Sequence, residues 1–191
     1  TAMHQLFKKT ANNEHSTDVS DFFNSKFVKN LEKNNKSLLI DILKTPNKGK
    51  KTPLSILFNT EKYSCQIKNF FDSTFVKNLE DECIEKLVDI LVLGNENDSS
   101  PINSIFHSSS YYIGEKIENF FNSEFTNKFK GKTKLQKKIL DELNKKYENE
   151  NISMHQLFKK AANNIHSKDV SYFFNSKFVK NLEKNNKSLL I

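Results

Sequence analysis

The sequence predicts an all-α protein: a right-handed α-solenoid of tandem repeats, with two to three helices in each repeat and no sheet. Three observations lead to this prediction. A 38-residue stretch at 3–40 recurs at 154–191 with only four differences. A shorter motif occurs four times along the chain. The apolar residues keep the i, i+3, i+4 spacing of amphipathic helices, and no segment shows the sustained alternation of a half-buried strand.

The short motif divides the chain into units. It has the form [VI]-x-x-F-F-[ND]-S-x-F and occurs at 19–27, 67–75, 117–125 and 170–178. An apolar segment precedes each copy, and a second apolar segment follows the first three. We therefore divide the chain into units 1–50, 51–99, 100–151 and 152–191, the last one truncated, and interpret it as a fragment of a longer array. A unit that is apolar on one face needs neighbours to cover that face.

Helix boundaries within the units are predicted by local signals. Pro53 and Pro101 suit the first turn of a helix, with Thr52 and Ser100 before them as N-caps. Gly94 and the turn around 47–49 mark helix ends. The Asn-Ser or Asp-Ser pair inside the motif either ends a helix or lies within a bent one, and we expect the helix to continue through it.

Adjacent phenylalanines recur at one position in all four units. Neighbouring residues on a helix point about 100° apart. We therefore expect one ring of each pair to pack inside its own unit and the other ring between units.

The start of the second unit is similar to a known repeat. Thr52-Pro53-Leu54 followed by Ile67-x-x-Phe70-Phe71 resembles the ankyrin repeat, in which T-P-L-H-x-A opens the first helix. The spacing of 48–53 residues between copies exceeds the ankyrin period of about 33, and the third apolar segment resembles a HEAT or armadillo unit. The resemblance implies a protein-binding scaffold without catalysis. Lysine- and asparagine-rich ankyrin-like arrays look similar to secreted effectors of intracellular bacteria and to some large-virus proteins, so the resemblance also implies an effector of a pathogen or symbiont.

Composition limits the chemistry. All 30 basic residues are lysine, and the net charge is +7 with 23 acidic residues interleaved. This charge permits an acidic partner, although interleaved charges are typical of a solvated surface. No apolar run is long enough to span a membrane. Cys65 and Cys83 do not recur between units, which favours reduced thiols and a soluble protein in a reducing compartment.

No catalytic, metal-binding or cofactor motif is predicted. Four histidines of the duplicated stretch, at positions 4, 15, 155 and 166, lack a third ligand nearby. Asp41, Asp89 and Asp141 recur at one position, and we interpret them as surface or inter-repeat hydrogen-bonding residues. The most basic segment supports an alternative function in nucleic-acid binding. Its lysines are Lys128, Lys130, Lys132, Lys134, Lys137 and Lys138.

The differences between the two 38-residue copies indicate where a partner binds. They are Thr10/Ala161, Glu14/Ile165, Thr17/Lys168 and Asp21/Tyr172. They leave the apolar stripe untouched, as expected for a fixed frame with a variable surface. We therefore expect a protein partner, with end-to-end self-association of the array as a further possibility. The expected contact residues are Glu14, Thr17, Asp21, Tyr63, Tyr111, Tyr112, Ile165, Lys168 and Tyr172.

Overall fold

The computed structural model describes residues 1–10, 13, 16–35, 37–59, 64–94, 100–107, 113–145, 153–162 and 167–190. These residues form helices and turns, with no strand among them, which confirms the prediction of an all-α protein. Among these residues, each sequence unit contributes four α-helices rather than the predicted two or three. The extra segment arises because the second predicted helix is broken in two.

The helices correspond from unit to unit. The first helices are α1 (Ala2–Thr10), α5 (Pro53–Phe58), α9 (Pro101–His107) and α13 (Ser153–Ala162). The second are α2 (Asp18–Phe23), α6 (Cys65–Phe71), α10 (Ile113–Phe121) and α14 (Ser167–Phe174). The third are α3 (Lys26–Asn34), α7 (Thr74–Lys77), α11 (Glu124–Asn127) and α15 (Lys177–Lys180). The fourth are α4 (Leu38–Lys44), α8 (Asp81–Val92), α12 (Thr133–Leu143) and α16 (Lys184–Lys187), which leads into a 3₁₀ turn, η1 (Ser188–Leu190).

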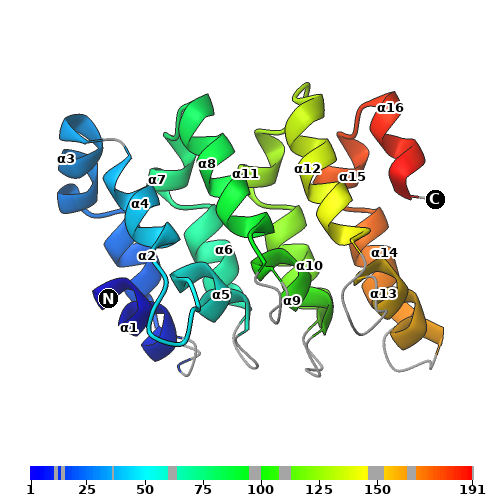
Figure 1. Ribbon diagram of the computed structural model, residues 1–191, viewed down its shortest axis with the longest axis horizontal. Helices are drawn as coiled ribbons and strands as arrows, with labels where there is room; N and C mark the ends of the chain where they lie inside the picture. The colour runs from blue at the N-terminus through cyan, green and yellow to red at the C-terminus, as the bar shows by residue number, and fades with distance from the viewer. Residues whose placement is uncertain are drawn as a thin grey trace.

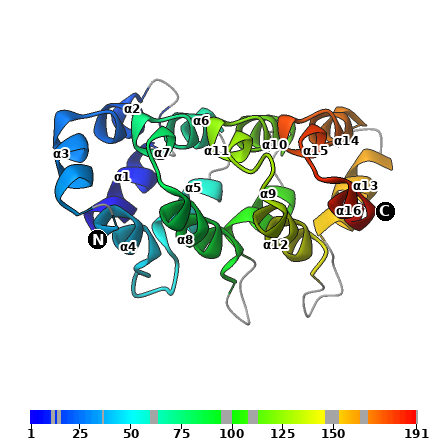
Figure 2. The ribbon, with the colours of Figure 1, turned by 90° about the horizontal axis from the view of Figure 1, so that it is seen from above.

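Corresponding helices lie side by side in rows (Figure 1). Seen from above, the second and fourth helices form the two outer rows and the first helices lie between them (Figure 2). Contacts agree, since α5 touches both α6 and α8, and α9 touches both α10 and α12. The apolar stripes of all the rows therefore face a shared interior.

The predicted helix starts at the prolines are confirmed. The Thr52 side chain accepts a hydrogen bond from the amide of Ser55 at 3.2 Å, and α5 begins at Pro53. The Ser100 side chain accepts one from the amide of Asn103 at 3.4 Å, and α9 begins at Pro101.

The prediction of a continuous helix through the Asn-Ser pair is wrong. The serine of the motif adopts an extended backbone and starts a new helix, as Ser73 does with φ −65° and ψ 158°. Its hydroxyl accepts the amide hydrogen of the residue three positions later, at 3.3 Å in this unit. An extended residue cannot belong to an α-helix, and the serine satisfies an amide that the first turn leaves unpaired. The same arrangement occurs at Ser25, Ser123 and Ser176.

The residue before this serine connects one unit to the next. Asn24 Oδ1 accepts the amide hydrogen of Thr74 at 2.6 Å, and Asp72 Oδ1 accepts that of Glu124 at 2.7 Å. Asn122 Oδ1 accepts that of Lys177 at 2.8 Å. The serine thus caps its own third helix, while the Asn or Asp caps the third helix of the following unit.

Replacing Asp72 with Ala is expected to lower the free energy of unfolding by about 0.5–2 kcal/mol, the range for loss of a helix cap. The matched control is Asn175→Ala. Asn175 is the exposed counterpart in unit 4, and its side chain caps no third helix in the described part of the chain. Urea titrations of both variants would measure the difference. Equal losses would show that the cap across units contributes nothing.

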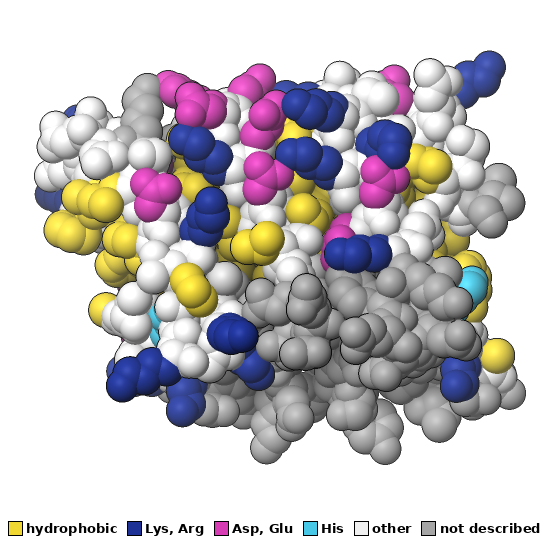
Figure 3. Space-filling model, viewed as in Figure 1, with side chains coloured by type: hydrophobic (Ala, Val, Ile, Leu, Met, Phe, Trp, Pro, Cys, Tyr) yellow, Lys and Arg dark blue, Asp and Glu magenta, His cyan; other side chains and the backbone are white. Residues whose placement is uncertain are grey.

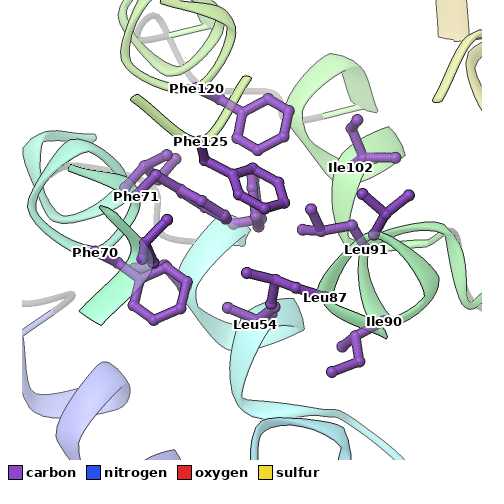
Figure 4. Close-up of a cluster of buried hydrophobic side chains, with 14 of the residues drawn as sticks. Leu54, Phe70, Phe71, Leu87, Ile90, Leu91, Ile102, Phe120 and Phe125 are labelled. Atoms are coloured by element: carbon purple, nitrogen blue, oxygen red, sulfur yellow. The ribbon is translucent and has the colours of Figure 1, made fainter. Parts of the chain in front are cut away.

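The paired phenylalanines form one continuous series of edge-to-face contacts through the molecule. The second ring of each pair meets the first ring of the next unit, with centroids 4.8 Å apart for Phe23–Phe70 and 4.9 Å apart for Phe71–Phe120. Phe121–Phe173 continues the series at 4.9 Å. We call this series the aromatic ladder; Figure 4 shows its middle part among buried leucines and isoleucines.

The prediction that one ring of each pair packs inside its own unit and the other between units is only partly right. The first ring of a pair, such as Phe70, reaches back to Phe7 and Phe23 of the preceding unit, as expected of a ring between units. The second ring does both, because Phe71 contacts Phe58 of its own unit and Phe120 of the next. Every internal unit boundary is therefore closed by both members of the pair.

Candidate protein-interaction surface

The outer row of second helices carries a stripe of accessible side chains. They lie two residues before and two residues after the Val or Ile that opens each motif. At these positions the four units carry Thr and Asp, Cys and Asn, Glu and Asn, and Lys and Tyr. All are exposed or half-buried. We call them the rim row: Thr17, Asp21, Cys65, Asn69, Glu115, Asn119, Lys168 and Tyr172.

Hydrogen bonds order part of the rim row. In unit 1, the Thr17 hydroxyl donates to Asp21 Oδ2 at 2.6 Å. Between units 2 and 3, the buried Ser64 hydroxyl donates to Glu115 Oε2 at 2.8 Å. It accepts in turn from the Asn119 amide at 3.1 Å. The outward-facing carboxylates of Asp21 and Glu115 are therefore held in defined positions, as a recognition surface requires.

Unit 4 presents a different chemistry on the same frame. Lys168 is exposed, and Tyr172 is 36% exposed. A Cβ atom on Gly114 of unit 3 would lie 2.8 Å from Cδ2 of Tyr172 and would also collide with Oδ1 of Asp169. The tyrosine ring is therefore seated against the backbone of the preceding unit. Tyr172, the counterpart of Asp21 in unit 4, therefore contributes to packing between units as well as to the exposed surface.

Replacing Gly114 with Ala is expected to destabilise the protein by about 1–3 kcal/mol, because the added methyl group displaces the Tyr172 ring. Gly49→Ala is the control, since its Cβ would meet only the side chain of Asn47, at 3.3 Å. Thermal unfolding of both variants would measure the effect. A Gly114→Ala protein as stable as the control would mean that the ring does not need this gap.

Only part of the predicted contact surface can be placed. Thr17, Asp21, Lys168 and Tyr172 lie in the rim row. Five predicted contact residues lie outside the described residues: Glu14, Tyr63, Tyr111, Tyr112 and Ile165. The rim residues of units 2 and 3 were not predicted. Units 1 and 4 differ two residues before and two residues after the Val that opens the motif. The same offsets from Ile67 and Ile117 would have identified the rim residues of units 2 and 3.

The basic segment is partly neutralised. Lys132 Nζ lies 2.5 Å from Asp81 Oδ1, and Lys138 Nζ lies 2.5 Å from Asp89 Oδ1, both in the preceding unit. Lys137 Nζ lies 2.6 Å from Asp141 Oδ2 on the same helix. Figure 3 shows acidic and basic side chains interleaved over the upper part of this face. Lys128, Lys130 and Lys134 form no ion pair with the described residues.

The recurring aspartates belong to this charged face. Asp89 and Asp141 accept the lysines just described, and Asp41 accepts a hydrogen bond from the Ser37 hydroxyl at 3.4 Å. Asp89 is exposed and also joins units 2 and 3, so both interpretations, a surface residue and an inter-repeat residue, apply to it. The described residues contain no group of three or more His, Cys, Asp or Glu placed to hold a metal ion.

The histidines of the duplicated stretch have different surroundings. His4 is buried, and its Nε2 donates to the backbone oxygen of Lys51 at 2.9 Å, because a carbonyl can only accept. His4 therefore joins the first helix of unit 1 to the start of unit 2. His155 is exposed, and His15 and His166 lie outside the described residues.

A groove of about 390 Å³ separates α3 from the start of α8. Burial raises the pKa of Glu32 in its wall, an effect that nearby Lys29 opposes. Its lining residues are Lys29, Glu32, Lys33, Asn78, Leu79, Glu80 and Cys83. Both charge signs are present, so the groove does not select an anionic or a cationic ligand.

Comparisons with known proteins supply no relative. No family model matches the chain, and no curated protein or solved structure matches it significantly. Among the described helices, none is long and apolar enough to cross a membrane. Because no relative is found, the class of the protein is defined by its fold alone. It is an all-α protein whose corresponding helices lie in rows.

Proposed function

We propose that the chain is a non-catalytic scaffold that binds another protein. In this proposal it is a right-handed α-solenoid with ankyrin-like helix starts, and the rim row is its contact surface. The rim row carries the proposal: its two accessible positions per unit vary between units, with only Asn69 and Asn119 alike, while the Phe-Phe pair that follows them is the same in all four units. Function in such a protein depends on the surface rather than on the fold.

Two further features support a protein partner. The rim row mixes acidic, basic, amide and aromatic groups, as protein interfaces do. The basic segment, in contrast, has three of its six lysines in ion pairs. Nucleic-acid binding usually relies on lysines that are available to phosphates. The observations therefore favour a protein over a nucleic acid.

Site-specific photo-crosslinking in an extract of the source cells would test the proposal. A crosslinker at position 168 is expected to capture a defined protein, and one at exposed position 134 is not. Charge reversals Lys168→Glu and Glu115→Lys are expected to abolish that capture, while Lys134→Glu leaves it unchanged.

Two outcomes would overturn the proposal. One is capture that survives both reversals in the rim row. The other is tight binding of DNA or RNA in a fluorescence-anisotropy titration at two salt concentrations. Binding that disappears when Lys128, Lys130 and Lys134 become glutamate would assign the function to the basic segment instead.

A further inference from the structure

The outward charges on the second helices of units 3 and 4 have opposite signs. Glu115 of α10 and Lys168 of α14 occupy the same position of the motif, and both are exposed. Glu118 of α10 is exposed as well. Figure 2 shows α10 and α14 next to each other in their outer row, and the two helices are in contact. Glu115 stays exposed although unit 4 packs beside it, so this position is accessible inside the array.

The residue that follows each of these charges is buried and has the opposite sign. Lys116 is fully buried, and its Nζ donates to the backbone oxygen of Phe58 in unit 2 at 3.2 Å. Asp169 is buried, with its Oδ1 packed against the backbone of Gly114 in unit 3. The sequence of α10 contains no other lysine, and that of α14 no other acidic residue. Neither helix therefore carries, on its outer face, a charge that would mask the exposed one.

The outward charges also lack ion pairs with other helices. Glu115, Glu118 and Lys168 form no ion pair with the described residues. In the fourth-helix row, by contrast, opposite charges meet across a unit boundary, as Lys138 and Asp89 do at 2.5 Å. Charges of adjacent units can thus reach each other in this fold, and those on α10 and α14 do not.

A hydrogen bond keeps the two signs apart. The buried Ser64 hydroxyl of unit 2 donates to Glu115 Oε2 at 2.8 Å. This bond directs the Glu115 carboxylate toward unit 2 rather than toward Lys168 in unit 4. A side chain that is already ordered loses less conformational entropy when a partner binds. Units 3 and 4 therefore present a fixed negative charge beside a positive one, and both are available to a ligand.

We propose that the second helices of units 3 and 4 select a protein partner by the order of its charges. A lysine or arginine of the partner binds Glu115 and Glu118, and an aspartate or glutamate binds Lys168. This inference rests on the proposed function and specifies which kind of segment the rim row accepts. Opposite charges placed in this way give specificity, because a segment with the reverse order meets like charges at both points.

The spacing of the two helices indicates the conformation of the partner segment. Packed helices lie about 8–10 Å apart, so the two partner charges need a similar separation. Seven residues of an α-helix span about 10.5 Å and return to the same face. Three residues of extended chain span about 10 Å, but their first and last side chains point to opposite faces. The segment is therefore a helix with a basic and an acidic residue seven positions apart.

Selection from a displayed peptide library tests the charge order. The library consists of alanine-rich helices of about 20 residues, a length at which isolated helices form, with their other positions randomised. Peptides selected on the wild-type chain are expected to carry the basic and acidic pair seven positions apart. Their binding would be measured by fluorescence anisotropy. The swapped variant, with Glu115→Lys, Glu118→Lys and Lys168→Glu, is expected to bind them about tenfold more weakly or worse.

Exchanging the charges of the peptide provides the decisive comparison. A peptide whose basic and acidic residues have traded places is expected to bind the swapped variant as the original binds the wild type. The control variant combines Glu85→Lys with Lys134→Glu, an exchange of exposed charges on the fourth-helix row. It is expected to bind the original peptide like the wild type. Circular dichroism would check that both variants are folded.

Three results would overturn the proposal. The first is a library that yields no binder, or binders without the charge pair. The second is peptide binding that the swapped variant retains. The third is binding that is lost in a folded swapped variant and not restored by the exchanged peptide, which would assign these side chains a role other than charge recognition. The proposed function fails separately, when a crosslinker at position 168 captures no protein from the extract.

Discussion

Replacing Phe71 with Ala is expected to lower the free energy of unfolding by about 3–5 kcal/mol, the usual range for truncating a buried phenylalanine. The side chain is fully buried. Its ring centroid lies 4.8 Å from that of Phe70 and 4.9 Å from that of Phe120. It also contacts Phe58 in its own unit and Phe125 in the next. Truncation opens a cavity at a boundary that these rings close from both sides.

The loss would be measured by chemical denaturation, with Phe174→Ala as the matched control. Phe174 occupies the same motif position in unit 4 but is only half-buried. We therefore expect a clearly smaller loss for Phe174→Ala, and a loss for Phe121→Ala close to that for Phe71→Ala. Equal stability of all three variants would mean that the ladder is not the core of the protein.

Replacing Gln136 with Leu is expected to cost on the order of 3 kcal/mol and to loosen the C-terminal segment selectively. The buried Gln136 amide nitrogen donates to the backbone oxygens of Phe129 and Asn181, each at 2.9 Å. Its oxygen accepts from the Glu183 amide at 2.9 Å and from the Asn186 side chain at 3.1 Å. Leucine keeps the volume but leaves several of these groups without a partner.

Hydrogen exchange would separate a local effect from a global one. Amides at 182–190 are expected to exchange faster in Gln136→Leu, while those of α1 and α2 keep their wild-type rates. Uniform acceleration across the chain would contradict the prediction, because it would mean that unit 4 unfolds only together with the rest.

The helical class and the two helix starts at Pro53 and Pro101 could be predicted because they depend on local chemistry. Thr52 and Pro53 define a helix start through their own side chains, and the spacing of Phe22 and Phe23 after Val19 defines an apolar face. The break at Asn24-Ser25 could not be settled in this way. The apolar stripe continues past it in phase, and the Asn side chain is committed only once Thr74 of the next unit lies beside it.

Apart from the phenylalanine pairs, most contacts between units could not be predicted from the sequence. Lys116 would be placed on a surface by its charge, yet it is fully buried and donates to the backbone oxygen of Phe58 at 3.2 Å. Phe27 would be placed in the core by its spacing, yet it is exposed because it lies at an end of the rows. The burial of Lys116 and the exposure of Phe27 both depend on whether another unit lies beside them. The sequence of a single unit does not indicate which unit that is.

The capping scheme across units has a consequence for how the gene can change length. Each internal boundary uses the same parts: an Asn or Asp oxygen from one side, a backbone amide from the other, and two phenylalanine rings. Residues 3–40 and 154–191 are nearly identical, so unequal recombination between two copies of the gene could insert 151 residues. The new junction would again join such parts. The chain can therefore be extended in a single genetic step without a new kind of interface.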